Sequence, residues 1–382
     1  MNLHTWYARA EKWFVGDKAP LRPLYPLYEA IEGFFFVLPK RTEHAPLVRD
    51  AVDIKRYMIA VVVALAPVYL FGLVAFGPRL LLMTAVSYAV GGLVETLFAI
   101  FRKEEINEGF LVTGLLFPMI LPPNTPLWII AVGIAFGVFF GKEVFGGTGH
   151  NIFNPALVGR CFVALSWPAH LARSYVEPLG WIEAFRNNGL MSFIVAPADA
   201  VTSATPLNII NTAVRQGRPP EFLSAFTLKL YTGWTNGSIC ETASILIILT
   251  GLFLCWTKVS SWRTTAAVIV GYLAVGFVLS MVWPMRFVTP IIGIGAGGIL
   301  FAAFYMATDP VTSPVSNKGK IIYGCGIGAL TVLFRGLGAI PEGVTYAVLM
   351  MNMVAPLLDR HFILRSVPAK LPRKEVVREG NG

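Results

Sequence analysis

Hydrophobic segments of membrane-spanning length recur along most of this 382-residue chain, and they constrain its fold more than any other feature. Of its residues, 55% are hydrophobic and only 14% are charged, whereas a soluble domain of this size carries about 25% charged residues. A bilayer accepts helices and closed barrels only, and apolar runs of about 20 residues indicate helices. We therefore predict an all-α polytopic membrane protein with ten spans, near residues 58–77, 80–101, 110–121, 127–145, 152–168, 243–257, 264–283, 288–306, 321–335 and 343–358.

Basic residues in the short loops predict how these spans are oriented. Loops after the even-numbered spans carry Arg102, Lys103, Lys142, Lys258, Arg263, Lys318 and Lys320. Short loops on the other face carry only Arg79, Arg286 and Arg335. Because cytoplasmic loops are enriched in Lys and Arg, both termini are expected in the cytoplasm. The net charge of +9 is then explained by these loops and by contact with anionic lipid, without any nucleic acid.

The span positions divide the chain into five parts. Residues 1–56 form a basic, amphipathic segment expected on the inner membrane face, and residues 359–382 form a basic cytoplasmic tail. Residues 57–168 and 243–358 are two five-helix halves, separated by an outward polar loop at 169–242. The third span is short, and glycines from Gly146 to Gly149 and from Gly293 to Gly298 interrupt both halves. Short, broken segments at matching places predict two inverted repeats with a binding centre between them.

Residues 199–205 of the outward loop form the motif with the most specific chemistry. Asp199, Thr202, Ser203, Ala204 and Thr205 resemble the site D-x-x-[ST]-x-A-T at which a flavin transferase joins FMN to a threonine through a phosphoester. Such a reaction requires an unhindered Oγ atom on a segment that can enter another enzyme. Pro206 discourages this segment from joining a helix before modification. The alternative interpretation is a turn rich in Ser and Thr.

Two dipeptides, Asn154-Pro155 and Asp309-Pro310, are typical of helix starts, with an N-cap residue followed by proline at the first helical position. A helix N-terminus inside a membrane also presents unpaired N–H groups and partial positive charge, which stabilise an anionic flavin or a ligand carbonyl. Asn151 and Asn154 lie on one turn, so that both side chains can bind one edge of an isoalloxazine ring.

Carboxylates inside membrane spans are rare and are therefore functional candidates. Glu95 lies one turn after Gly91-Gly92, a pair that fits either a close helix–helix contact or a flat slot for a quinone ring. Asp309 and Asp359 belong to the same class of carboxylates, although Asp359 can instead pair with Arg360. For Arg160 we expect a paired or snorkelling role, with charge compensation of a flavin as the second possibility. The four scattered cysteines predict no metal site.

Several stretches together resemble the B-type subunit of the sodium-translocating NADH:quinone reductases, and less closely the D-type subunit of the related Rnf complexes. They are 47–56, 105–110, 141–149, 154–157 and 306–310. This resemblance implies covalent FMN on Thr205, non-covalent riboflavin at Asn151 and Asn154, and ubiquinone near Gly91, Gly92 and the N-terminal segment. It also implies that carboxylates take part in sodium uptake, namely Glu95 and, further, Glu29, Asp309 and Asp359.

The expected function is that of a membrane subunit in a respiratory sodium pump of the bacterial inner membrane. Electrons would pass from FMN through riboflavin to ubiquinone while Na⁺ is translocated. The chain has no Rossmann fingerprint, so that NADH oxidation falls to a partner subunit. The resemblance implies partners of the A, C, D, E and F types, besides the flavin transferase and membrane lipid. The alternatives are an Rnf subunit, which couples ferredoxin and NAD, and a passive channel for small solutes, which would contain no flavin.

Overall fold

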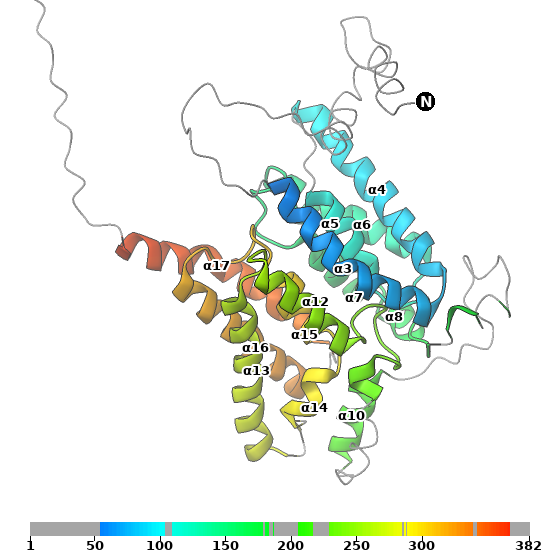
Figure 1. The fold of residues 1–382 in the computed structure, drawn as a ribbon, viewed down its shortest axis with the longest axis vertical. Helices are drawn as coiled ribbons and strands as arrows, with labels where there is room; N and C mark the ends of the chain where they lie inside the picture. The colour runs from blue at the N-terminus through cyan, green and yellow to red at the C-terminus, as the bar shows by residue number, and fades with distance from the viewer. Residues whose placement is uncertain are drawn as a thin grey trace, which may run out of the picture.

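The structure is a computed structural model that describes residues 54–103, 109–178, 180–182, 186, 205–216, 229–284, 286–287, 289–338 and 342–366. All the elements that these residues form are helices, as predicted (Figure 1). The first half consists of α3 (Ile54–Phe76), α4 (Arg79–Arg102), α5 (Gly109–Met119), α6 (Leu127–Gly141) and α7 (Pro155–Ser166), with a short 3-10 turn at Glu143–Phe145.

Two shorter helices, α8 (Pro168–Arg173) and α10 (Pro206–Arg215), lie in the segment between the halves. The second half begins with α12 (Ser244–Trp256) and α13 (Trp262–Val282). It continues through α14 (Pro290–Gly295), α15 (Ile299–Phe301) and a π-helical turn at Ala302–Met306, and ends with α16 (Asn317–Leu337) and α17 (Val344–Ser366). Helices thus lie at the predicted positions of the spans.

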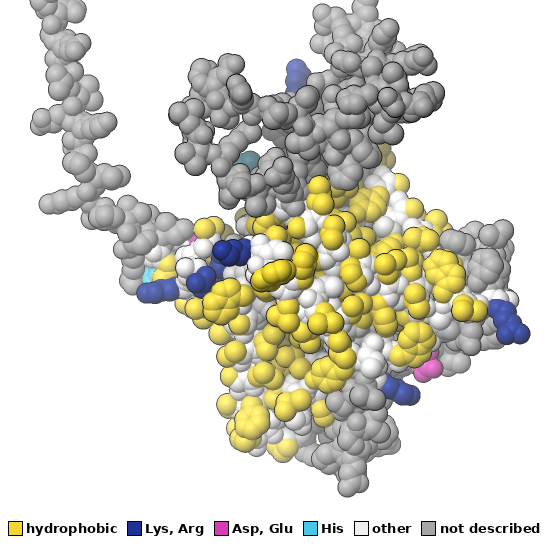
Figure 2. All heavy atoms as spheres, viewed as in Figure 1, with side chains coloured by type: hydrophobic (Ala, Val, Ile, Leu, Met, Phe, Trp, Pro, Cys, Tyr) yellow, Lys and Arg dark blue, Asp and Glu magenta, His cyan; other side chains and the backbone are white. Residues whose placement is uncertain are grey.

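Five of the described helical segments are long and apolar enough to cross a membrane: Tyr57–Phe76, Arg79–Arg102, Leu127–Phe145, Trp262–Val282 and Asn317–Leu337. Helices α5, α7 and α12 are apolar but shorter. Large hydrophobic side chains remain exposed along α3, α12 and α13, and Figure 2 shows them covering one face of the molecule. Exposed apolar surface of this extent fits lipid rather than water. The chain is therefore a polytopic membrane protein.

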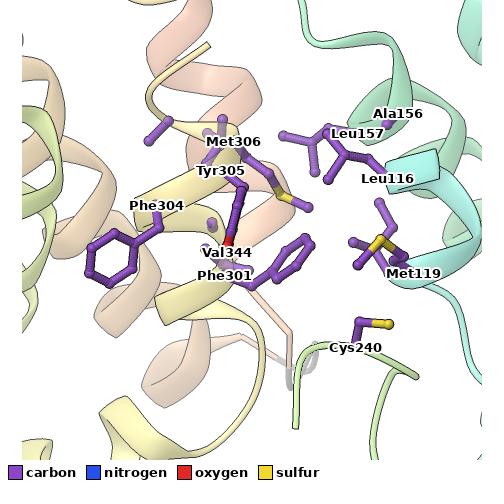
Figure 3. Packing of buried hydrophobic residues seen from close by; sticks show 14 of the residues in the cluster. Leu116, Met119, Ala156, Leu157, Cys240, Phe301, Phe304, Tyr305, Met306 and Val344 are labelled. Carbon is purple, nitrogen blue, oxygen red and sulfur yellow. The ribbon is translucent and has the colours of Figure 1, made fainter. Parts of the chain in front are cut away.

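The two halves pack in the same order. In the first half α4 packs against α6 and α6 against α7, and in the second half α13 packs against α16 and α16 against α17. Contact between α3 and α12, the first helix of each half, joins them. Apolar side chains from both halves meet in the centre, including Leu116, Met119, Leu157, Phe301, Tyr305, Met306 and Val344 (Figure 3).

Glycines break the third span of the second half, as predicted. Helix α14 ends at Gly295, and Gly297 adopts a φ of +73°, in the left-handed region that favours glycine. A Cβ atom at Gly298 would lie only 2.3 Å from a carboxylate oxygen of Glu241, so no side chain fits there. The break therefore lets a carboxylate from the segment before α12 approach the backbone inside the bundle.

Candidate functional site

A cavity between the two halves brings together residues from several predicted sites. Its empty volume, counted together with the solvent at its open mouth, is about 690 Å³. The polar residues that line it are Tyr57, Thr113, Lys142, Thr148, Asn151, Asn154, Ser260, Tyr305, Thr308 and Asp309. We call it the central cavity.

Asn154 and Asn151 are both buried at this cavity, at the start of α7. The Asn154 side-chain oxygen accepts hydrogen bonds from the N–H groups of Ala156 and Leu157, at 3.1 and 3.4 Å. The predicted N-cap is therefore confirmed. Asn151 holds the preceding loop, because its Nδ2 donates to the Phe153 carbonyl and its Oδ1 accepts from Gly149 N–H. One asparagine caps the helix while the other shapes the loop, and both line the cavity.

Asp309 also lines the cavity, but the predicted helix start at Asp309-Pro310 is wrong. Residues 310–312 form a turn, and the next helix begins only at Asn317. The Asp309 carboxylate accepts from Val311 N–H at 3.2 Å and from the Thr312 hydroxyl at 3.1 Å. These local hydrogen bonds compete with a helical arrangement, which is a known tendency of aspartate. Asp309 is thus held at the cavity by a hydrogen-bonded turn.

Glu95 forms a buried ion pair that leads to the same cavity. Its Oε1 accepts from Lys142 Nζ at 2.5 Å, and the two side chains are only 6% and 3% exposed. The second carboxylate oxygen, Oε2, is buried without a hydrogen-bond partner in the described part of the chain. Lys142 also lines the central cavity. The partner of Glu95 is therefore placed next to a ligand bound in that cavity.

Gly91 and Gly92 lie against α5. A Cβ atom at Gly91 would stand 2.7 Å from Phe110 and 2.9 Å from Ile134, and one at Gly92 would stand 3.3 Å from Phe110. The glycines therefore allow a close approach of an aromatic side chain. Quinone binding near them stays a prediction, because residues 1–53 lie outside the described part of the chain.

The remaining predicted carboxylates are placed only in part. Asp359, in α17, accepts from the backbone N–H groups of Val315 and Ser316 at 2.8 and 2.9 Å, just before α16. Its carboxylate thus holds the chain entering that helix. Glu29 lies outside the described residues, as do Asp199, Thr202, Ser203 and Ala204 of the flavin motif.

Thr205 is described, and it caps a helix. It is 6% exposed, its carbonyl accepts from Ile209 N–H at 3.0 Å, and its Oγ1 accepts from Asn208 N–H at 3.4 Å. Pro206 therefore begins α10 directly after the threonine, whereas we expected this proline to keep the segment out of a helix and the Oγ atom to be unhindered. Thr205 lines a second pocket, with Thr235, Glu241, Gly297 and Glu342 among the other lining residues; its empty volume is about 340 Å³ when the open solvent is included. We call it the Thr205 pocket.

A buried arginine network borders the Thr205 pocket, and sequence reasoning found only its arginine. Arg160 of α7 is 3% exposed and pairs with Glu241 at 2.5 Å, with Glu342, and with the Ser238 hydroxyl. The Tyr175 hydroxyl donates to Glu342 at 3.0 Å, and burial raises the pKa of this phenol well above its usual value. The predicted pairing of Arg160 is confirmed, with two carboxylates.

Packed apolar side chains lie between the two pockets. Figure 3 shows Ala156 and Met306 at one side of this cluster and Cys240 at the other. Ala156 follows Pro155 of the central cavity, whereas Cys240 precedes Glu241 of the Thr205 pocket. Phe301 and Tyr305 fill the space between them. Buried apolar side chains of the described residues therefore lie between the two pockets.

Comparison with known proteins gives consistent matches over almost the whole chain. The family described as "NQR2, RnfD, RnfE family" matches residues 41–367. The chain is 35% identical to the B-type subunit of the Na(+)-translocating NADH-quinone reductase of Ectopseudomonas mendocina (strain ymp), over 91% of this chain and 94% of that protein. It is 33% identical to the corresponding protein of Yersinia pestis, over 98% and 100%, and 34% identical to that of Azotobacter vinelandii, over 96% and 95%.

Proposed function

This chain belongs to the NQR2, RnfD and RnfE family, and we propose that it is the B-type subunit of a sodium-translocating NADH:quinone reductase. In this proposal the chain passes electrons from FMN on Thr205 through riboflavin to ubiquinone, and it couples this transfer to Na⁺ translocation. The other subunits supply the electrons, and a flavin transferase attaches the FMN. Similarity to three B-type subunits along nearly their full length is the observation that carries the proposal.

We place the chain in the bacterial inner membrane, with ten spans in two inverted five-helix repeats and both termini in the cytoplasm. The matching packing order of the two halves supports the repeat. The basic residues of the short loops support the orientation. In this orientation the Thr205 pocket belongs to the outward side, whereas Lys142, Asp309 and the mouth of the central cavity belong to the inward side.

The surroundings of Thr205 suit a covalently bound phosphate group. Its Oγ1 caps the first turn of α10, where the helix dipole favours an anion. The Thr205 pocket lies beside this oxygen, and the adjoining chain of the cofactor would extend along it. FMN and riboflavin would supply one-electron transfer at the two sites.

Riboflavin would bind at the central cavity, whose wall carries the polar side chains that can hydrogen-bond it. Asn151 and Asn154 would hydrogen-bond the ring edge, and the start of α7 would stabilise negative charge on it. Lys142 adds a positive charge to the same wall. The apolar cluster in Figure 3 keeps water from the space between the two flavins.

The ion pair between Lys142 and Glu95 supports a role for Glu95 in ion uptake. Negative charge in the central cavity attracts Lys142 and thereby weakens its hold on Glu95. A carboxylate that loses its partner in a buried position gains affinity for a cation. We place ubiquinone near Gly91 and Gly92, and we retain Asp309, Asp359 and Glu29 as further candidates for sodium or proton transfer.

Fluorescence of the denatured protein on a gel tests whether FMN is attached to Thr205. Wild-type chain expressed with its flavin transferase is expected to give a fluorescent band, and Thr205→Val is expected to abolish it. Thr235→Val is a matched control, since Thr235 lines the same pocket and is also buried. A dark wild-type band, or a bright Thr205→Val band, would refute the assignment of FMN to Thr205.

The Rnf alternative is separated by its electron donor, because the family includes the D-type subunit of those complexes. We expect the complex that contains this chain to reduce quinone with NADH in a sodium-dependent manner. Sodium-dependent exchange of electrons between ferredoxin and NAD would instead support the Rnf assignment. A fluorescent band at Thr205 would exclude the passive channel, which requires no flavin.

A further inference from the structure

Arg335 of α16 is a buried cation that uses only part of its hydrogen-bonding capacity. The residue is 6% exposed, and its Nη1 donates to the Tyr272 hydroxyl at 3.0 Å and to the Gly293 carbonyl at 2.6 Å. Its Nε and Nη2 atoms are buried, and among the described residues they have no hydrogen-bond partner. Within the same residues, no carboxylate pairs with this guanidinium.

A buried guanidinium with unpaired donors destabilises the folded protein unless an anion binds it. Arginine remains protonated in proteins, so Arg335 cannot escape the cost of burial by losing its charge. The Tyr272 ring, 5.4 Å from the guanidinium carbon, and one backbone carbonyl compensate it only in part. The two free atoms, Nε and Nη2, form the edge of the guanidinium that binds carboxylates and phosphates through two parallel hydrogen bonds.

Arg335 lies behind Gly297, which forms part of the wall of the Thr205 pocket. Gly297 lines that pocket, and a Cβ atom built on it would lie 3.0 Å from Arg335 Nη2. The same Cβ position lies 3.6 Å from Leu207 Cδ2, in the first turn of α10. The broken helix therefore brings Arg335 close to the residues that directly follow Thr205, with only a glycine between them.

The other arginine at this pocket is already neutralised. Arg160 pairs with both Glu241 and Glu342, so that it has no free charge for a further anion. These two carboxylates line the Thr205 pocket and repel an anion placed there. An anion on Thr205 therefore needs a second cation, and in the described part of the chain Arg335 is the neighbouring cation without a carboxylate partner.

We propose that Arg335 is the internal counter-ion of the phosphodiester formed on Thr205, which it binds through Nε and Nη2. This inference rests on the proposed function, because that function supplies the phosphodiester. A phosphodiester carries one permanent negative charge and two free oxygens, which match the charge and the two donors of the guanidinium edge. The first turn of α10 and Arg335 then hold the phosphate from two sides, and Gly297 leaves the space for this contact.

A double-mutant cycle between Thr205 and Arg335 tests the proposal in the complete complex, expressed with the flavin transferase. Thr205→Val removes the anion and Arg335→Gln removes the cation. The readouts are band fluorescence, which reports FMN attachment, and the apparent Tm at a fixed heating rate. Arg335→Gln is expected to lower Tm by about 2–4 °C when Thr205 carries FMN. In the Thr205→Val background it is expected to leave Tm unchanged or to raise it, because no anion remains to balance the arginine.

Equal Tm changes by Arg335→Gln in both backgrounds would overturn the proposal, as would a Tm gain in the flavinylated protein. Arg286→Gln is the control, since Arg286 is exposed and is expected to change Tm equally little in both backgrounds. Should Arg335→Gln fail to assemble, Arg335→Lys decides the matter, because lysine keeps the charge but lacks the fork. Arg335→Lys is expected to lower Tm only when FMN is attached. An equal decrease in both backgrounds contradicts the proposal.

The gel and the Tm measurements separate FMN attachment to Thr205 from the contact of Arg335 with the phosphate. A dark wild-type band refutes FMN attachment and this proposal with it. A bright wild-type band with additive Tm changes leaves FMN on Thr205 and refutes the role of Arg335 alone.

Discussion

Replacing Lys142 with methionine tests whether Glu95 depends on its buried ion pair. Lys142→Met keeps an unbranched side chain but removes the ammonium group, which lies 2.5 Å from Glu95 Oε1. Because Glu95 Oε2 already lacks a partner among the described residues, the variant leaves the whole carboxylate without compensation. Breaking a buried pair in this way costs about 3–5 kcal/mol of stability.

The neighbouring pair provides a matched control. Arg102 and Glu143 pair at 2.9 Å, with side chains 23% and 4% exposed, so water reaches this pair from the arginine side. Arg102→Gln also keeps a hydrogen-bond donor, and it is therefore expected to cost less stability than Lys142→Met. In the double variant Glu95→Gln/Lys142→Met neither charge of the pair remains. We therefore expect the double variant to recover most of the stability that Lys142→Met loses.

The assay is the apparent thermal transition of the purified complex, measured for all variants at one heating rate. The sodium dependence of quinone reduction is measured on the same samples, and Glu95→Gln is expected to weaken it more than Arg102→Gln does. The reasoning is refuted if Lys142→Met destabilises no more than Arg102→Gln. It is also refuted if the double variant loses the sum of the two single losses.

Two further predictions concern the cavity and the helix contact. Gly92→Ala places a methyl group 3.3 Å from Phe110, so the ring must shift by a few tenths of an ångström, and quinone kinetics or inhibitor sensitivity is expected to change. Wild-type quinone kinetics would show that the glycine serves helix packing only. Asn154→Ser keeps an N-cap acceptor for α7 but removes the amide, so acid-extractable flavin should fall while Tm stays near wild type. Asn154→Ala should lower both the extractable flavin and Tm, because losing the N-cap costs about 0.5–2 kcal/mol of stability. Unchanged extractable flavin in both variants would place riboflavin elsewhere.

Features encoded in short stretches of sequence were predictable. Apolar runs predicted where the helices lie, and Asn154-Pro155 predicted the start of α7. The cap could be predicted without the fold because the Asn154 side chain binds an amide only two residues away. The glycines up to Gly298 predicted the broken helix for a similar reason. The same N-cap pattern gave a wrong prediction at Asp309-Pro310, where the carboxylate accepts hydrogen bonds within a turn and no helix follows directly.

Partners far apart in the sequence were not predictable in the same way. Arg160 was expected to be paired, but nothing in its own span indicates Glu241 or Glu342, which lie in segments before α12 and α17. Lys142 was counted only as a basic loop residue, although its side chain is buried against Glu95. One signal was available for Arg335: a lone arginine late in an apolar span has to find a partner.

The pairing of Arg160 with two distant carboxylates has a consequence for how the chain is made. Glu241 follows Arg160 by 81 residues and Glu342 follows it by 182. At the usual pace of about 5–20 residues per second, the ribosome supplies the first carboxylate about 4–16 s after the arginine and the second about 9–36 s after it. During that interval α7 holds an uncompensated cation, which favours keeping it at the translocon or near lipid headgroups. The complete Arg160 network can therefore form only when the last helix is being synthesised.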